Sequence, residues 1–131
     1  MKYIENIFKF FVTALILISI SVPVWAVTIP AHTNDFYVND FAKIFTQEEQ
    51  VQLVSKAVTF AEQHNGVQVV ITTVESLEGE PLENYALNMY NTYEIGKDDM
   101  GVLILLSVND RDVRMQTGIA MEKYLTASKC R

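Results

Sequence analysis

The sequence predicts an α/β domain in which helices pack on a small mixed sheet. Segments 67–74 and 101–108 are apolar, and they lack the polar–apolar alternation of a half-exposed strand. Strands of this kind are covered on both faces. Two segments with helical periodicity, starting near residues 46 and 81, each precede one of these strands. Helices that alternate with strands through short links are typical of a layered α/β sheet.

The start of the chain is predicted to be a secretory signal peptide, residues 1–26, followed by one domain at residues 27–131. Two lysines precede an almost unbroken apolar run from Phe10 to Val22, and small residues lead up to Ala26. The run is shorter than the roughly 18 residues that a membrane span needs, so we favour cleavage after Ala26 over an uncleaved anchor. The domain is therefore expected to be extracytoplasmic, either secreted or associated with the cell envelope.

Composition and charge limit the classes of protein to consider. The chain has 131 residues, which suffice for one domain, and a formal net charge of −6. Nucleic-acid binding needs a basic surface, so the charge argues against that class, whereas an acidic balance is compatible with binding cations. The single cysteine, Cys130, excludes an intramolecular disulfide.

The first helix is predicted to begin at Thr46 and to end at the Asn65-Gly66 pair. Thr46 and Glu49 match a capping box, in which each side chain bonds a free backbone N–H of the first turn. An Asn-Gly pair favours the left-handed conformation that ends a helix. The segment before this helix is expected to be an extended lead-in with a short edge strand within residues 36–40. The inner face of the helix is expected to carry Val51, Val54, Ala57, Val58 and Ala61.

The second helix is predicted between Pro81 and Gly96, since proline suits the start of a helix and glycine its end. The crossover through this helix makes strands 67–74 and 101–108 parallel. Its inner face is expected to carry Leu82, Tyr85, Ala86, Met89, Tyr90 and Tyr93.

The chain is then predicted to return through a tight turn at residues 109–112 into an antiparallel strand. Segment 120–125, which follows this strand, is expected to open a third helix. Alternation in the strand places Val113, Met115 and Thr117 on one face and Arg114 and Gln116 on the other.

This topology assigns the acidic loops to two opposite edges of the sheet. The turn at residues 109–112 lies with the loop after strand 67–74 at the carboxyl edge of the parallel strands, and the loop before strand 101–108 lies at the other edge. Carboxylates and the exposed carbonyl groups of that loop, which glycines flank, suit calcium or magnesium; the alternative is a solvated turn. The residues predicted to bind the ion are Asp98, Asp99 and Glu122, with Asp40 brought there by the extended lead-in.

The other acidic group, Asp110-Arg111-Asp112, is interpreted as a hairpin tip with a local ion pair, although Arg111 could instead meet a phosphate. His32 and His64 lack metal-ligand spacing and are interpreted as surface residues. The sequence contains no G-x-S-x-G motif and no phosphate-binding glycine-rich loop. No catalytic residue is therefore assigned.

Five segments in order resemble the TPM-domain family, an exported or lumenal family with an α/β/α sandwich fold. They cover Val38 to Thr126 and read VNDFAKIF, NGVQVVITTV, ALNMYNTYEIG, DMGVLILLSVNDRDVRMQTG and GIAMEKYLT. Three positions depart from the family pattern: Tyr93 stands where Trp is usual, Ala120 where a second Gly is usual, and Ala127 where Asp is usual. Family members also continue beyond this point, so the resemblance predicts a three-layer α/β/α sandwich that is incomplete at its C-terminal end.

The resemblance implies a divalent-cation site and a role at the cell envelope. Asp40 and Asp99 match acidic positions of the family, with Asp98 as a neighbour. A plant thylakoid member is associated with acid phosphatase activity and photosystem repair, and an animal member is an accessory protein of a receptor channel.

Three functions are considered. The first is a cation-binding accessory or assembly module with an envelope protein as partner, associated with the membrane through an uncleaved signal or a further C-terminal segment. The second is a weak metal-assisted phosphatase, in which a cation held by Asp98 or Asp99 polarises a phosphoryl oxygen and a water attacks. The third is a truncated fragment without activity. The accessory module is preferred, because the sequence offers no evident nucleophile or tuned base.

Overall fold

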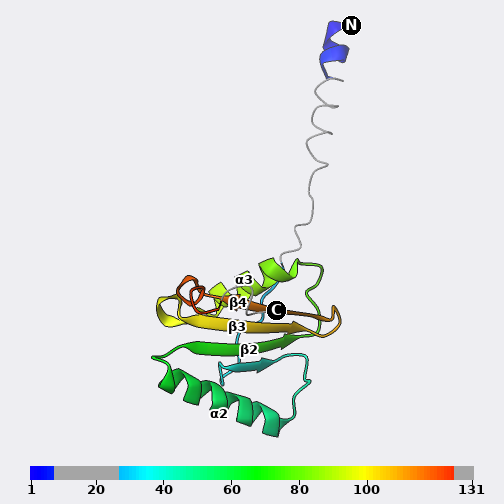
Figure 1. The fold of residues 1–131 in the computed structure, drawn as a ribbon. Coiled ribbons are helices and arrows are strands. Elements are labelled where there is room, and N and C mark those ends of the chain that lie inside the picture. Colours follow the sequence, from blue (N-terminus) through cyan, green and yellow to red (C-terminus); the bar gives the residue numbers. More distant parts are fainter. Residues whose placement is uncertain (8–26, 126–131) are drawn as a thin grey trace.

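A four-stranded mixed sheet forms the centre of the domain in the computed structural model, which describes residues 1–7 and 27–125 (Figure 1). The first three strands are parallel, and the last is antiparallel to the third. The predicted α/β fold with a small mixed sheet is therefore confirmed. Most of the predicted signal peptide, residues 8–26, lies outside the described ranges. In their order across the sheet, the strands are β1 (Val38–Asp40), β2 (Gln68–Val74), β3 (Gly101–Ser107) and β4 (Asp112–Thr117).

Helix α3 (Leu82–Thr92) covers one face of the sheet, over β3 and β4. Pro81 stands just before its first residue, and Gly96 follows its end with a φ of 82°. Its inner face is the predicted one, and it meets the sheet at Val70, Val74, Leu103 and Leu105. The residues that α3 and its end bury there are Tyr85, Ala86, Met89, Tyr90 and Tyr93, with Leu82 packed against them.

The lead-in segment 27–36 covers the part of this face next to β1. Its apolar side chains pack against the same cluster as α3. The hydroxyl of Tyr93 donates a hydrogen bond to the carbonyl of Pro30 at 2.9 Å. The fully buried Asn39 accepts from the N–H of Thr33 at 2.6 Å and donates to the carbonyl of Phe36 at 2.8 Å. The segment is therefore part of the folded domain. It leads into β1, which is the predicted short edge strand.

Helix α2 (Gln47–Gln63) lies on the opposite face of the sheet, over β1 and β2 (Figure 1). The capping box of Thr46 and Glu49 is present in full. Asn65 and Gly66 have φ values of 54° and 81°, so the predicted left-handed end of the helix is confirmed.

The predicted inner face of α2 is wrong at two positions. Ala57 is the buried residue of this helix, whereas Val51 is 62% exposed and Val58 is 36% exposed. The helix rests on only half of the sheet face, and no second α-helix lies beside it among the described residues. It therefore buries a narrower stripe than the periodicity indicated.

Two short 3₁₀ turns lie at the edge where β3 begins. The turn η1 (Lys97–Asp99) precedes β3, and η2 (Ile119–Met121) follows β4. The third helix expected at residues 120–125 does not form within the described chain, which continues after η2 as a hydrogen-bonded turn up to Leu125. In residues 1–7 and 27–125, no helix has the length and apolar character needed to cross a membrane.

Candidate functional site

Asp40 lies at the carboxyl edge of the sheet, where it holds the loop that enters α2. It ends β1 and pairs in register with Thr73 of β2. One carboxylate oxygen accepts hydrogen bonds from the Thr73 hydroxyl and from the N–H of Ile44, the latter at 3.1 Å. The other oxygen accepts from the N–H of Phe45 at 2.9 Å and from the side-chain amide of Gln50 at 3.3 Å. Both oxygens are therefore engaged by donors of the fold.

These contacts set the charge of Asp40. Burial raises the pKa of the Asp40 carboxyl, but the hydrogen bonds from Thr73, Phe45, Ile44 and Lys43 together lower it by more. The pKa therefore lies below its usual value, and the group is a carboxylate at neutral pH. A cation at this oxygen pair would have to displace hydrogen bonds that position the start of α2.

Asp110 organises a second part of the same edge. One of its carboxylate oxygens accepts from the hydroxyl of Ser107 at 2.6 Å and from the N–H of Leu77 at 2.8 Å. The bond from Ser107 and then that from Leu77 lower the pKa of Asp110. The turn at residues 109–112 is thus tied to the loop after β2, which confirms that both loops share the carboxyl edge.

The ion pair expected at the hairpin tip is not formed. Arg111 is exposed with a φ of 57°, and its guanidinium makes no salt bridge with its acidic neighbours within the described residues. The reason is that the Asp110 carboxylate turns inward to its two donors. The salt bridge that the described residues do form joins Arg114 of β4 to Glu83 of α3 at 3.1 Å.

Asp98 and Asp99 lie in η1 at the opposite edge, with exposed side chains. Their φ values are 55° and 60°, a left-handed conformation that aspartate tolerates better than most residues. The two glycines that flank the pair are in close contact, since a Cβ on Gly96 would overlap the backbone of Gly101. The backbone therefore approaches itself closely at Gly96 and Gly101, and the loop between them presents both carboxylates to solvent.

Glu122 comes to this same edge because η1 and η2 lie against each other. Gly118, which precedes η2, is so close to the carbonyl of Asp99 and the hydroxyl of Tyr90 that a Cβ would overlap both. The backbone thus groups the exposed residues Asp98, Asp99 and Glu122 at one edge. Even so, the described chain contains no cluster of three or more His, Cys, Asp or Glu side chains that could hold a metal ion.

Asp40 does not join these residues. Its register partner Thr73 pairs with Leu106 of β3, whereas η1 precedes Gly101 at the start of that strand. Leu106 and Gly101 are five residues apart along β3, and a strand rises about 3.3 Å per residue. Asp40 therefore lies about 16 Å from the start of β3 along the strand direction. Parallel pairing with β2 places the last residue of β1 at the carboxyl edge, and the sequence of the lead-in carried no signal for that pairing. Metal binding by the other three acids stays a prediction.

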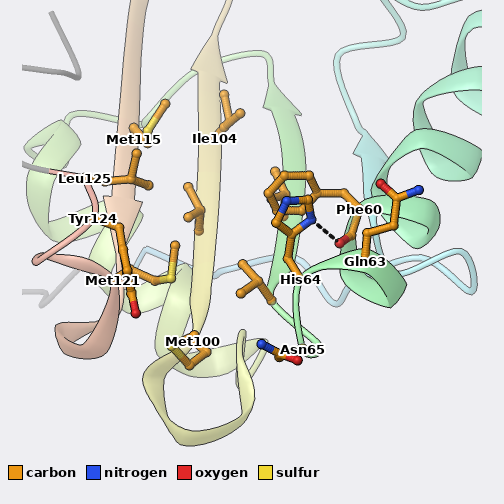
Figure 2. Close-up of a pocket in the computed structure, with 13 residues that line it drawn as sticks. Phe60, Gln63, His64, Asn65, Met100, Ile104, Met115, Met121, Tyr124 and Leu125 are labelled. Atoms are coloured by element: carbon orange, nitrogen blue, oxygen red, sulfur yellow. Dashed lines mark hydrogen bonds between the residues drawn. The ribbon is translucent and has the colours of Figure 1, made fainter.

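The structure contains an apolar groove of about 510 Å³, whose lining residues the sequence did not single out (Figure 2). It lies on the α2 face, where no helix of the described residues covers β3 and β4. Ile104 and Met115, which are register partners, form its floor with Val69 of β2. Phe60 of α2 stands on one side, and Met121 lies with the rest of segment 121–125 on the other.

The signal that could have revealed the groove was the alternation of β4. That alternation placed Val113 and Met115 on one face, and both are exposed in the structure, at 64% and 39%. The apolar face of this strand was therefore visible in the sequence, but the position of α2 was needed to show that no described helix covers it.

Most polar side chains of the groove come from the C-terminal end of α2. Among the described residues, no Asp, Glu, Lys or Arg side chain lines it. The ring of His64 stacks on Phe60 with centroids 4.0 Å apart, and its Nδ1 lies 2.9 Å from the carbonyl of Phe60. Because a carbonyl only accepts, Nδ1 is the donor in this contact. His64 is thus a fixed polar group at the rim.

Comparison with known proteins places the chain among its relatives. The sequence model of the TPM domain matches residues 38–131. The chain belongs to the TPM domain family. This TPM domain is similar to the solution NMR structure of the N-terminal domain of a protein from P. gingivalis, with a TM-score of 0.66 and 25% sequence identity. The similarity covers 72% of this chain and 61% of that chain, so the TPM domain described here spans less than two thirds of its structural neighbour. No curated protein matches the sequence.

Proposed function

We propose that this chain is an extracytoplasmic accessory module of the TPM family that binds another polypeptide through its apolar groove. The observation that carries the proposal is the groove itself, in which the residues described by the structure leave an apolar surface open and contribute no charged side chain. The centres of protein interfaces are depleted of charged residues and enriched in Met and aromatic residues. Three methionines and Phe60 line this groove.

The described polar side chains also fit a binding role better than a catalytic one. The two histidines, His32 and His64, each lie within hydrogen-bonding distance of a backbone carbonyl. The two carboxylates with lowered pKa values, Asp40 and Asp110, hold loops at the carboxyl edge. We therefore expect phosphate-ester hydrolysis to stay at background with or without calcium and magnesium. Hydrolysis that needs the cation and disappears in Asp99→Ala would support the phosphatase instead.

A photo-crosslinking experiment in cells that export the protein tests the binding role. A photoreactive amino acid at Met115, on the floor of the groove, should form a covalent adduct with a discrete polypeptide. The control position is Leu87, which is 43% exposed on α3 at the other face of the sheet. Adducts from the groove position alone support the proposal. The same adducts from both positions, or none from either, would contradict it.

A second candidate function is divalent-cation binding, which the contact between η1 and η2 favours because it groups Asp98, Asp99 and Glu122 at one edge. Exposed carboxylates there would repel one another less with an ion bound. Extracellular calcium sites have dissociation constants on the order of 10⁻⁴–10⁻³ M. Calcium at about ten times that constant would stabilise the fold by roughly 1.4 kcal/mol. The melting temperature should then rise by about 5–10 °C.

Matched variants test this cation site. Asp99→Asn should remove most of the rise in melting temperature, whereas Asp112→Asn, at the start of β4 on the opposite edge, should leave it intact. A melting temperature that responds to neither calcium nor magnesium would show that these acids are solvated loop residues. Loss of the response in Asp112→Asn alone would move the site to the hairpin.

A further inference from the structure

We propose that Asn65 is a site of spontaneous deamidation, and that opening of the last turn of α2 controls the reaction. Deamidation begins when the backbone nitrogen of the next residue attacks the side-chain carbonyl carbon of an asparagine. A following glycine favours this attack most, because it has no side chain to obstruct the approach. Of the asparagines in the chain, only Asn65 is followed by glycine. The reaction needs only water, so it is independent of the proposed binding function.

The covalent change at Asn65 is a hydrolysis in two steps. The backbone nitrogen of Gly66 loses its proton and attacks Cγ of Asn65, while the bond from Cγ to the side-chain nitrogen breaks and that nitrogen leaves as ammonia. The product of this step is a succinimide ring. Water then opens the ring at either of its carbonyl carbons, which gives aspartate or isoaspartate. Overall, water is consumed, ammonia is released, and OH replaces the NH₂ of the side chain.

The described part of the chain leaves the reacting atoms uncrowded. Asn65 and Gly66 are exposed and follow the end of α2. A Cβ placed on Gly66 would meet no atom within 4 Å. By contrast, Asn39 is fully buried and its side-chain amide is hydrogen-bonded at both ends. Other asparagines lie within α3, where the helix fixes the backbone. Steric crowding therefore does not protect Asn65 as it protects these residues.

The closed form of the turn nevertheless holds the attacking nitrogen back. The N–H of Gly66 donates a hydrogen bond to the carbonyl of Ala61 at 2.8 Å, and the N–H of Val67 donates to the carbonyl of His64 at 3.2 Å. While the first bond is formed, the Gly66 nitrogen keeps its proton and is directed at Ala61. Ring closure must therefore wait until the turn opens, and the rate in the folded protein depends on how often it does so.

Two features of the helix end decide how often the turn opens. The ring of His64 stacks on Phe60 with centroids 4.0 Å apart, and its Nδ1 lies 2.9 Å from the Phe60 carbonyl (Figure 2). Both contacts keep the turn closed. The last turn also contains Glu62 and no basic residue, and a negative charge at the C-terminal end of a helix is unfavourable. An exposed helix end of this kind opens without unfolding of the whole domain, and His64 restrains it.

The product of the reaction weakens the connection between α2 and β2. Deamidation adds a negative charge to the helix end that already carries Glu62. Isoaspartate also lengthens the main chain by one carbon, just before the buried Val67 that leads into β2. Asn65→Asp, which reproduces the aspartate product, should lower the melting temperature by about 2–5 °C.

The test is incubation of the exported protein at mildly alkaline pH, followed by mass spectrometry of its peptides, with the same protein in urea as the reference. The folded protein should gain the mass of the NH₂-to-OH exchange at Asn65, more slowly than in urea. His64→Ala removes the ring stacking and the hydrogen bond, so it should speed the reaction in the folded protein by roughly five- to tenfold. It should leave the rate in urea unchanged.

His32→Ala is the matched control. It also removes a histidine ring that contacts a phenylalanine and a backbone carbonyl, but it does so in the lead-in segment, on the face of the sheet opposite α2. It should change neither rate, and far-UV circular dichroism verifies that both variants fold. Equal rates in the folded protein and in urea would overturn the inference, as would faster modification of another asparagine. Failure of folded His64→Ala to react faster than the unchanged protein would refute control by this turn.

Discussion

The Asp40→Asn substitution tests how the carboxyl edge of the sheet holds the start of α2. An asparagine can keep one oxygen toward the Thr73 hydroxyl and the N–H of Ile44. Its amide nitrogen would then face the N–H of Phe45 and the amide of Gln50, which are both donors. The substitution therefore removes two hydrogen bonds to a charged acceptor. It also leaves the N–H of Phe45 and the amide of Gln50 facing a third donor, the amide nitrogen of the substituted side chain.

The size of the effect follows from these contacts. A hydrogen bond to a charged group contributes about 1.5–3 kcal/mol. Water can reach part of this loop and replace some of what is lost, so we expect a loss of about 2 kcal/mol of stability in total. For a domain of this size, that lowers the melting temperature by about 8–16 °C.

The effect should depend on pH in a defined direction. Because hydrogen bonds lower the pKa of Asp40 in the folded protein, its contribution is fully present above the unfolded value of about 3.9. It is lost as the pH falls through the lower folded value. The gap between Asp40→Asn and the unchanged protein should thus be constant from neutral pH to about pH 5 and shrink below about pH 4.

Thermal unfolding followed by circular dichroism at several pH values checks this prediction. Asp112→Asn is the control, since it removes an acidic charge from an exposed side chain at the same edge. It should change the melting temperature little. An Asp40→Asn protein that melts within about 2 °C of the unchanged protein at neutral pH would show that the four hydrogen bonds do not hold the α2 entry.

Three further predictions concern other parts of the chain. Tyr93→Phe removes the hydroxyl that bonds the Pro30 carbonyl and should cost about 1 kcal/mol in urea unfolding; an unchanged midpoint would mean that the lead-in is held by packing alone. Gly118→Ala places a methyl group against the carbonyl of Asp99 and should cost about 1–3 kcal/mol, whereas equal stability would show that η1 and η2 separate easily. Intact-mass analysis of the exported protein should give Val27 as the first residue, and retention of Met1 in a membrane fraction would favour an uncleaved anchor.

The sequence by itself determined the elements whose causes are local. The capping box of Thr46 and Glu49 and the left-handed pair after α2 are made by neighbours in the chain, and both appear where they were predicted. The inner face of α3 was also predictable, because α3 shares its face of the sheet with the lead-in segment and both pack into one core cluster. The mixed pairing of the strands followed from the lengths and types of their connections.

Only the tertiary structure decided what depends on partners distant in the sequence. Asp40 was expected beside Asp98 and Asp99, but the pairing of β1 with β2 carries it to the opposite edge. Val51 and Val58 have the spacing of buried residues, yet they face solvent because α2 rests on half of a sheet face. The groove also depends on the position of α2 on the sheet. Apolar periodicity predicts which residues are suited to burial. Only the packing of the other elements shows which of these residues stay exposed among those described.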